Sequence, residues 1–238
     1  MINLMFHDVY LTSPTESGFA DADYKLIRTK FEAIVEHCHN REDIQFTFDD
    51  GGISNYKLVA PILEKFGKRG IFFIPTNYIG REGFLCGEQI VDLHQRGHII
   101  GVHSHSHPEN MRLLSKQEIS EEWASSTRII RDLLHEDVKY ASLPNGYCSK
   151  YILESIERAG IECLYTSSPT RHSFKKGRML LTGRFVVKSE VEMNDIEAIM
   201  SSPVYRFKLA LKWKLLSIPK VLLGSKYEAI KAKIFKNG

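Results

Sequence analysis

The sequence has few cysteines, and they lie far apart. Only four occur among 238 residues, at positions 38, 86, 148 and 163, and no two form a C-x-x-C pair. Small disulfide-stabilised domains carry several closely spaced cysteines. We therefore predict no disulfide framework and expect these thiols to be reduced and mostly buried.

Long hydrophobic runs are missing too. No stretch approaches the roughly 18 consecutive apolar residues of a membrane-spanning helix. Residues 1–9 lack a basic region followed by an apolar run, which an export signal would have. Both absences predict a cytoplasmic protein. Internal repeats and the glycine-rich patterns that bind phosphates are also absent.

The composition is that of a globular protein. Hydrophobic residues make up 43% and charged residues 26%, which is enough apolar material to bury a core. The length indicates one large domain, or one domain with an appendage.

Charge is distributed unevenly along the chain. Residues 203–238 contain nine Lys or Arg and one acid, so this segment carries +8 while residues 1–202 carry −5. Apolar residues alternate with lysines over 207–218, Pro219 interrupts the pattern, and apolar residues resume at 227. We therefore predict a domain over 1–202 and a basic amphipathic helical tail over 203–238. The tail could contact an anionic membrane or pack on the domain. No nucleic-acid recognition motif accompanies it.

Seven short apolar segments have the pattern of strands. They cover residues 2–6, 44–48, 71–74, 99–102, 140–143, 163–165 and 179–187. Segments with helical spacing lie between them, around 26–35, 56–66, 90–93, 119–134 and 152–159. Repeated strand–helix units predict a parallel α/β architecture, and about seven units favour a barrel over an open sheet.

Polar residues follow most of these strands. They are His7 and Asp8, Asp49 and Asp50, Thr76 and Asn77, the histidines 103, 105 and 107, Asn145, Ser167 and Ser168, and Arg184. Because the carboxyl ends of parallel strands meet at one face, we expect these side chains to converge.

Two of these groups predict a metal site. An Asp-Asp-Gly segment alone is typical of a turn, and alternating histidines could share one exposed face of a strand. Together, however, two imidazoles four residues apart and one of the two aspartates form a set that leaves coordination positions open for catalysis. Water bound to such a metal has a pKa near 7, and the second aspartate could act as a base.

The sequence resembles the polysaccharide deacetylase family, also called the NodB homology or carbohydrate esterase 4 group. The resemblance lies in T-F-D-D-G (47–51), H-S-x-x-H (103–107) and L-P-N-G-Y (143–147), and it extends over roughly residues 3–190. Residues 4–7 and 183–185 are similar to the branch found with exopolysaccharide and lipopolysaccharide biosynthesis.

This resemblance implies a distorted (β/α) barrel with fewer than eight complete units, followed here by the basic tail. It also implies a divalent metal, most often zinc, held by Asp50, His103 and His107. Asp49 would match the general base, and a backbone N–H near Asn145 would stabilise the oxyanion. His105 matches a variable position.

Two positions depart from the family pattern. Ser142 stands where many members have an arginine that orients the base, and Arg184 is expected to replace it from another strand. The late Leu-x-His that supplies the general acid is missing, which leaves His172 and His7 as candidates. Loss of that acid would weaken catalysis by roughly 10²- to 10⁴-fold.

The predicted function is metal-dependent removal of an N-acetyl group from an amino sugar in cell-surface polysaccharide or lipopolysaccharide biosynthesis. The substrate would be a glycan or a lipid-linked or nucleotide-linked sugar, reached from the cytoplasm or at the inner face of the membrane. A deformylase acting on a lipid-linked sugar and a catalytically silent glycan-binding protein are the alternatives.

Overall fold

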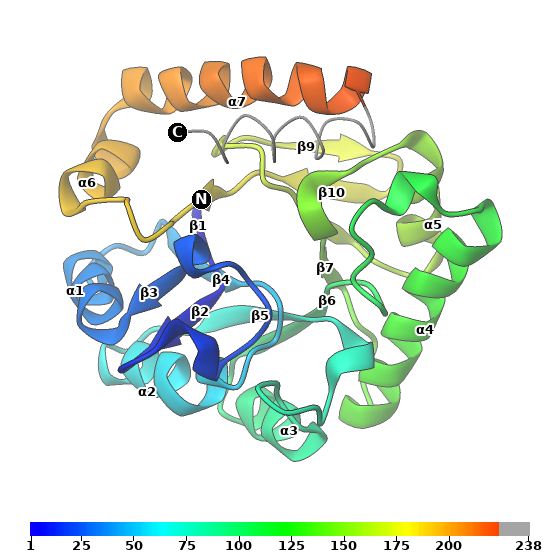
Figure 1. The fold of residues 1–238 in the computed structure, drawn as a ribbon, viewed down its shortest axis with the longest axis horizontal. Coiled ribbons are helices and arrows are strands. Elements are labelled where there is room, and N and C mark those ends of the chain that lie inside the picture. Colours follow the sequence, from blue (N-terminus) through cyan, green and yellow to red (C-terminus); the bar gives the residue numbers. More distant parts are fainter. Residues whose placement is uncertain (224–238) are drawn as a thin grey trace.

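The structure is a computed structural model that describes residues 1–223, with side chains to residue 215. Nine strands form one curled sheet in the order β11-β1-β4-β5-β6-β7-β8-β10-β9 (Figure 1). The strands are β1 (Ile2–Phe6), β4 (Ile44–Phe48), β5 (Gly70–Ile74), β6 (Ile99–Val102), β7 (Tyr140–Ser142), β8 (Cys163–Tyr165), β9 (Ser173–Lys176), β10 (Met179–Thr182) and β11 (Phe185–Val186). All neighbours are parallel except β10 and β9.

The curled sheet forms a half-barrel. The chain connects the two sides of this half-barrel directly, through the short link between β10 and β11. Only Gly183 and Arg184 separate β10 from β11, yet β10 pairs with β8 while β11 pairs with β1. Asn3 Nδ2 donates a hydrogen bond to the Gly183 carbonyl at 2.9 Å, which ties this crossing to β1. The predicted distorted barrel is confirmed, with the last predicted strand divided into β10 and β11.

Seven α-helices accompany the sheet within the described part of the chain. They are α1 (Arg28–Cys38), α2 (Ala60–Lys65), α3 (Gly87–Gln95), α4 (Lys116–Leu134), α5 (Lys150–Arg158), α6 (Met193–Ser201) and α7 (Pro203–Leu223). Helices α1 to α5 surround the outside of the curled sheet (Figure 1) and correspond to the five predicted helical segments. A small parallel sheet of β2 (Asp8–Tyr10) and β3 (Lys25–Ile27) precedes α1.

The core lies between the sheet and its helices. Every residue of β1 and β5 is buried, as expected for strands covered on both faces. Phe6, Phe48 and Phe72 stack in sequence across β1, β4 and β5, with ring centroids 5.4 and 5.0 Å apart. The carboxyl ends of these strands are thereby fixed, and they carry the site.

Helix α7 begins directly after α6 and is attached to it by side chains. Tyr205 donates a hydrogen bond to Asp195 at 2.6 Å, and Arg206 Nη1 donates to the Ile199 carbonyl at 2.7 Å. Although Pro219 interrupts the pattern of apolar residues and lysines, α7 continues through it to Leu223. A proline inside a helix removes one backbone hydrogen bond and can bend the helix without ending it.

Only part of the predicted basic tail is described, and it lies in helix α7. The apolar positions predicted from residue 227 onward lie outside the described residues. Among helices that are described, none is both long enough and apolar enough to cross a bilayer.

Candidate metal centre and active site

Several of the polar groups predicted at strand ends lie at one edge of the sheet in the structure. Asp49 and Asp50 follow β4, the histidine segment follows β6, and Ser142 ends β7. Arg184 lies at the crossing between β10 and β11. The common edge of the parallel sheet therefore gathers groups from distant parts of the sequence.

Asp50, His103 and His107 form a cluster that could hold a metal ion. Asp50 Oδ1 lies 3.5 Å from Nε2 of each histidine, and all three ligand atoms lie within 4.8 Å of one another. Two ligands about 2.1 Å from a tetrahedral zinc ion are roughly 3.4 Å apart, so the spacing fits such an ion. The nitrogen and oxygen donors also suit a divalent metal.

Neighbouring groups orient the first of these histidines. His103 Nδ1 lies 2.5 Å from Ser142 Oγ and 3.1 Å from the Ser142 carbonyl oxygen, and it can donate its proton to either. Nε2 then carries a free lone pair directed toward Asp50. This outer hydrogen bond is the type that fixes metal-binding histidines.

Unusual backbone conformations aim the ligands inward. Asp50, Ser104 and His107 have φ angles of 71°, 60° and 55°, in the left-handed region that few non-glycine residues adopt. The turn at Asp50 immediately after β4 lets the two adjacent aspartates face different partners. Such conformations cost energy and persist where the surrounding structure enforces them.

Asp49 is held by a buried ion pair with Arg184. Arg184 Nη1 and Nη2 donate to the two carboxylate oxygens at 2.7 and 2.8 Å, and Ser142 Oγ donates at 3.1 Å. Burial alone would raise the pKa of Asp49, but the charges of Arg184 and His103 outweigh it and hold the pKa below its usual range. Asp49 is therefore an oriented, ionised carboxylate.

Burial also sets the protonation of the side chains in the candidate metal cluster. It raises the pKa of Asp50 to about 6, with Asp49 and Asp8 adding to this rise and His7 and His107 opposing it. Burial lowers the pKa of His107 to about 4. At neutral pH the histidine is neutral and the carboxylate mostly ionised, which is the state that binds metal.

Glu122 of α4 was not predicted, although it shapes the histidine segment. Its carboxylate accepts hydrogen bonds from the backbone N–H groups of His105 and Ser106 at 2.9 and 2.8 Å, and from Ser106 Oγ at 2.6 Å. His105 in turn pairs with Thr76 Oγ1 at 2.8 Å. Glu122 thus fixes the turn between His103 and His107.

The two candidate proton donors lie in different places. His7 follows β1, which is the neighbour of β4, and its charge affects the pKa of both Asp49 and Asp50. Its ring packs against Tyr24 with centroids 4.8 Å apart. His172 is exposed and precedes the edge strand β9. The sheet order thus brings His7, rather than His172, close to the aspartates.

Asn145 lies in the loop after β7, beside the histidine segment. It is exposed, has a φ angle of 54°, and its Nδ2 lies 3.4 Å from the carbonyl oxygen of Pro108. Pro108 directly follows His107, so this loop borders the metal cluster.

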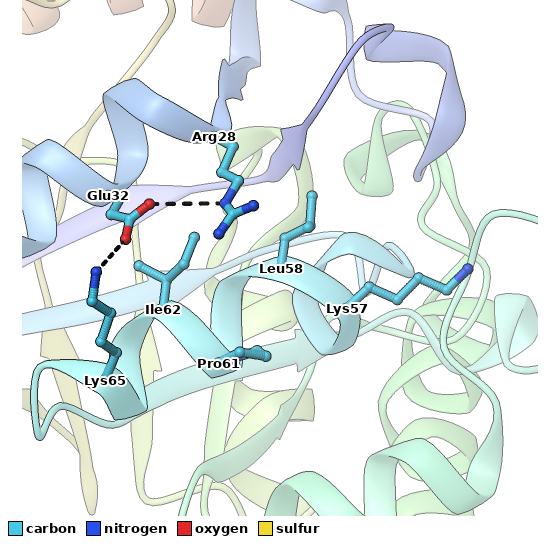
Figure 2. Close-up of a pocket in the computed structure, with 7 residues that line it drawn as sticks. All are labelled: Arg28, Glu32, Lys57, Leu58, Pro61, Ile62 and Lys65. Atoms are coloured by element: carbon cyan, nitrogen blue, oxygen red, sulfur yellow. Dashed lines mark hydrogen bonds and ion pairs between the residues drawn. The ribbon is translucent and has the colours of Figure 1, made fainter.

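A surface pocket elsewhere contains none of these residues. It has a volume of about 210 Å³ and lies between α1 and α2, where Arg28, Lys65 and Glu32 form ion pairs (Figure 2). The candidate active site is therefore identified by its cluster of acidic and histidine side chains, and not by this pocket.

Comparisons with known proteins agree with this chemistry. A family model described as polysaccharide deacetylase matches residues 36–164. The chain is 29% identical over 156 residues to YxkH of Bacillus subtilis (strain 168), a candidate polysaccharide deacetylase, covering 66% of this chain and 54% of that protein. It is 27% identical over 139 residues to the peptidoglycan-N-acetylmuramic acid deacetylase PdaA of the same organism, covering 58% and 51%.

The fold has solved counterparts. A polysaccharide deacetylase from Bacillus cereus superposes with a TM-score of 0.73 and 16% identity, over 84% of this chain and 68% of that one. At this identity the likeness concerns the fold alone. The chain spans about half the length of the curated relatives it matches.

Proposed function

The chain belongs to the polysaccharide deacetylase family, and from that premise we propose that it is a metal-dependent hydrolase that removes an N-acetyl group from an amino sugar. The observation that carries this proposal is the buried Asp49–Arg184 pair beside the Asp50, His103 and His107 cluster. A relative is named for a deacetylase of peptidoglycan N-acetylmuramic acid, which supports an acylated amino sugar as substrate.

Each group has a role that follows from its surroundings. Asp50, His103 and His107 would hold the ion, and zinc suits two imidazoles and one carboxylate. A bound divalent ion would polarise the acyl carbonyl and lower the pKa of water toward about 7. Asp49 accepts the proton of the attacking water, and Arg184 keeps that carboxylate oriented. Backbone N–H groups of the Asn145 loop stabilise the developing oxyanion.

His7 is the better candidate for protonating the departing amine. It follows the strand beside Asp49 and influences both aspartates, whereas His172 is exposed near the edge of the sheet. We therefore assign this role to His7 in place of His172. His7→Gln should lower kcat by roughly 10²-fold or more, while His172→Gln should leave it unchanged.

Metal content and product identity test the proposed function together. The purified protein should contain about one divalent ion per chain, and a His103→Ala, His107→Ala double variant should contain little. Acetate released from N-acetylated sugars supports a deacetylase, and formate released from N-formylated sugars supports the deformylase alternative. Asp49→Asn should bind metal but lose activity. A glycan-binding protein without catalysis would release neither product although it holds the metal.

Helix α7 supports a peripheral contact with an anionic membrane. Its side chains Val204, Phe207, Leu211, Trp213 and Leu215 are between 41% and 68% exposed, and Lys208, Lys212 and Lys214 lie among them. Exposed apolar groups flanked by cations are typical of helices that lie on anionic lipid surfaces. The proposed boundary between the domain at 1–202 and the tail at 203–238 falls at the start of α7.

This contact fits an enzyme of polysaccharide or lipopolysaccharide biosynthesis that meets a lipid-linked sugar at the inner face of the membrane. The unpaired thiols of all four cysteines agree with a cytoplasmic location. Phe207→Glu with Leu211→Glu should abolish sedimentation with vesicles rich in phosphatidylglycerol, while Phe174→Glu on β9 should not. Equal sedimentation of both variants would contradict the membrane contact.

A further inference from the structure

One hydroxyl group lies between the candidate base and the candidate metal cluster. Ser142 Oγ is 3.1 Å from Asp49 Oδ1 and 2.5 Å from His103 Nδ1. The serine ends β7, the strand beside β6, and it is fully buried. Water does not compete for either contact, and hydrogen bonds are stronger in such surroundings than in water.

The two contacts of the Ser142 hydroxyl run in opposite directions. Asp49 is an ionised carboxylate that can only accept, so the hydroxyl donates its single proton to it. The hydroxyl oxygen keeps its lone pairs and can accept a hydrogen bond from His103 Nδ1–H. The three groups therefore form a chain that runs from the ring N–H through the hydroxyl to the carboxylate.

The backbone offers the same ring N–H a second acceptor. The carbonyl oxygen of Ser142 lies 3.1 Å from His103 Nδ1, farther than the hydroxyl oxygen. The hydroxyl is also polarised by the carboxylate behind it, and linked hydrogen bonds strengthen one another in a buried site. Either acceptor keeps the proton on Nδ1. Loss of the hydroxyl therefore preserves the tautomer of His103 but removes its link to Asp49.

This chain changes the properties of the groups at both of its ends. A partner that accepts from the ring N–H of a metal-binding histidine raises the basicity of the other ring nitrogen and fixes the ring. That nitrogen is His103 Nε2, which lies 3.5 Å from Asp50 Oδ1 in the cluster. In the other direction, a ring that shares its Nε2 lone pair with a cation donates more strongly from Nδ1. The hydroxyl is then a stronger donor to Asp49.

We propose that Ser142 is a positioning residue that couples the metal cluster to the base. Its hydroxyl makes the metal affinity of His103 depend on the carboxylate of Asp49, and it makes the placement of Asp49 depend on His103. The inference rests on the metal site of the proposed function and is independent of which substrate that site receives.

A double-mutant cycle on zinc affinity tests the coupling without turnover. The proteins are the parent, Ser142→Ala, Asp49→Asn and the double variant, and competition with a chelator gives each dissociation constant. Ser142→Ala should weaken zinc binding about tenfold. Asp49→Asn removes a charge 3.9 Å from His103 Nε2, so it weakens binding in both backgrounds. Its effect should be at least about threefold larger when the Ser142 hydroxyl is present.

Nitrogen chemical shifts of the His103 ring give a readout that a merely structural role would not move. In the zinc-free protein at pH 8, Asp49→Asn should shift the Nδ1 resonance more in the parent than in the Ser142→Ala background. Ser142→Thr keeps a hydroxyl and should retain more zinc affinity than Ser142→Ala. The matched control is Ser126→Ala, which removes another fully buried hydroxyl, on α4, and should leave zinc affinity unchanged.

The outcomes separate the coupling from the proposed function. Equal effects of Asp49→Asn in the two backgrounds overturn the coupling, as does a loss of zinc affinity in Ser126→Ala as large as that in Ser142→Ala. If the cycle shows coupling while the parent releases no acetate from N-acetylated sugars, the role of Ser142 stands and deacetylation fails. Circular dichroism establishes that each variant is folded.

Discussion

Arg184 is fully buried and places a charged donor on each oxygen of Asp49. Arg184→Met should lower the free energy of unfolding by about 3–5 kcal/mol, because it leaves the Asp49 carboxylate buried without its counter-ion. It should also lower kcat/KM by at least about 100-fold, since the base loses its orientation. Urea unfolding and steady-state kinetics measure the two effects.

A double variant separates the effect of the unpaired Asp49 charge on stability from the effect of Asp49 orientation on activity. Adding Asp49→Asn to Arg184→Met removes the unpaired charge, so stability should partly return while activity stays lost. Unchanged stability of the single variant would show that the ion pair does not matter for folding.

Glu122 acts on the site only through the histidine segment. Glu122→Gln removes the charge that receives the N–H groups of His105 and Ser106, and zinc affinity should fall about tenfold with little change in melting temperature. Competition against a chelator measures the affinity. The control is Glu121→Gln, on the adjacent residue of α4, whose side chain is exposed. A similar loss in both variants would contradict the positioning role.

Individual site residues could be predicted from the sequence where they belong to a short motif. The two aspartates and the two histidines were visible as motifs at strand ends, whereas Arg184 was predicted from the family resemblance, as the replacement for the arginine missing at Ser142. Glu122 gave no such signal, because a glutamate next to a tryptophan is common in helices. Its role is visible only once the structure places α4 beside the loop that follows β6. Choosing between His7 and His172 required the order of strands in the sheet.

At the scale of elements, α6 and α7 are joined by the Tyr205–Asp195 hydrogen bond. That bond to Asp195, helped by burial, raises the pKa of Tyr205 to about 12. Because the folded pKa exceeds the unfolded value near 10, the bond contributes fully below pH 10 and is lost as the pH rises through about 12.

Tyr205→Phe should therefore lower the free energy of unfolding by about 1 kcal/mol at pH 8, and the difference from the parent should vanish near pH 12. Urea unfolding at both pH values provides the measurement. A difference that persists undiminished in alkali would exclude this hydrogen bond as its source.

Most elements with strong apolar patterns were predicted, whereas β9, the β2–β3 sheet and helix α6 were missed. All four residues of β9 are exposed, and β9 pairs with β10, which no local pattern reveals. Helix α6 did carry a readable signal, since it buries Ile196, Ile199 and Met200 at helical spacing. The small β2–β3 sheet depends on a contact between separated segments.

At the scale of the whole molecule, Gly183 lies where the chain closes the half-barrel. A Cβ atom at this position would lie 2.5 Å from the Ser168 carbonyl oxygen and 2.6 Å from that of Thr170. Gly183→Ala should cost about 1–3 kcal/mol of stability and lower activity, because backbone atoms must shift next to Arg184. Thermal unfolding and acetate release check this. Gly67→Ala, which meets no neighbour within 4 Å, should retain activity, although the left-handed backbone at Gly67 (φ 67°) will cost it some stability.

The barrel architecture could be predicted from the number of strand–helix units, but its manner of closure could not. Local apolar patterns show that residues 179–187 are extended, and they do not reveal that the two halves of this segment pair with strands at opposite ends of the parallel run.

Because of this closure, we expect the contacts of β11 to form later in folding than those among the earlier strands. Leu4 of β1 pairs with Phe46 of β4 on one side and with Phe185 of β11 on the other, so the second partner of the first strand lies almost at the far end of the domain. Contacts between such distant segments carry a large loop-closure cost and form slowly. During synthesis, the ligand cluster from β4 and β6 can assemble while Asp49 still lacks Arg184. In a nascent chain, Asp50, His103 and His107 are therefore expected to come together before Asp49 gains its arginine partner.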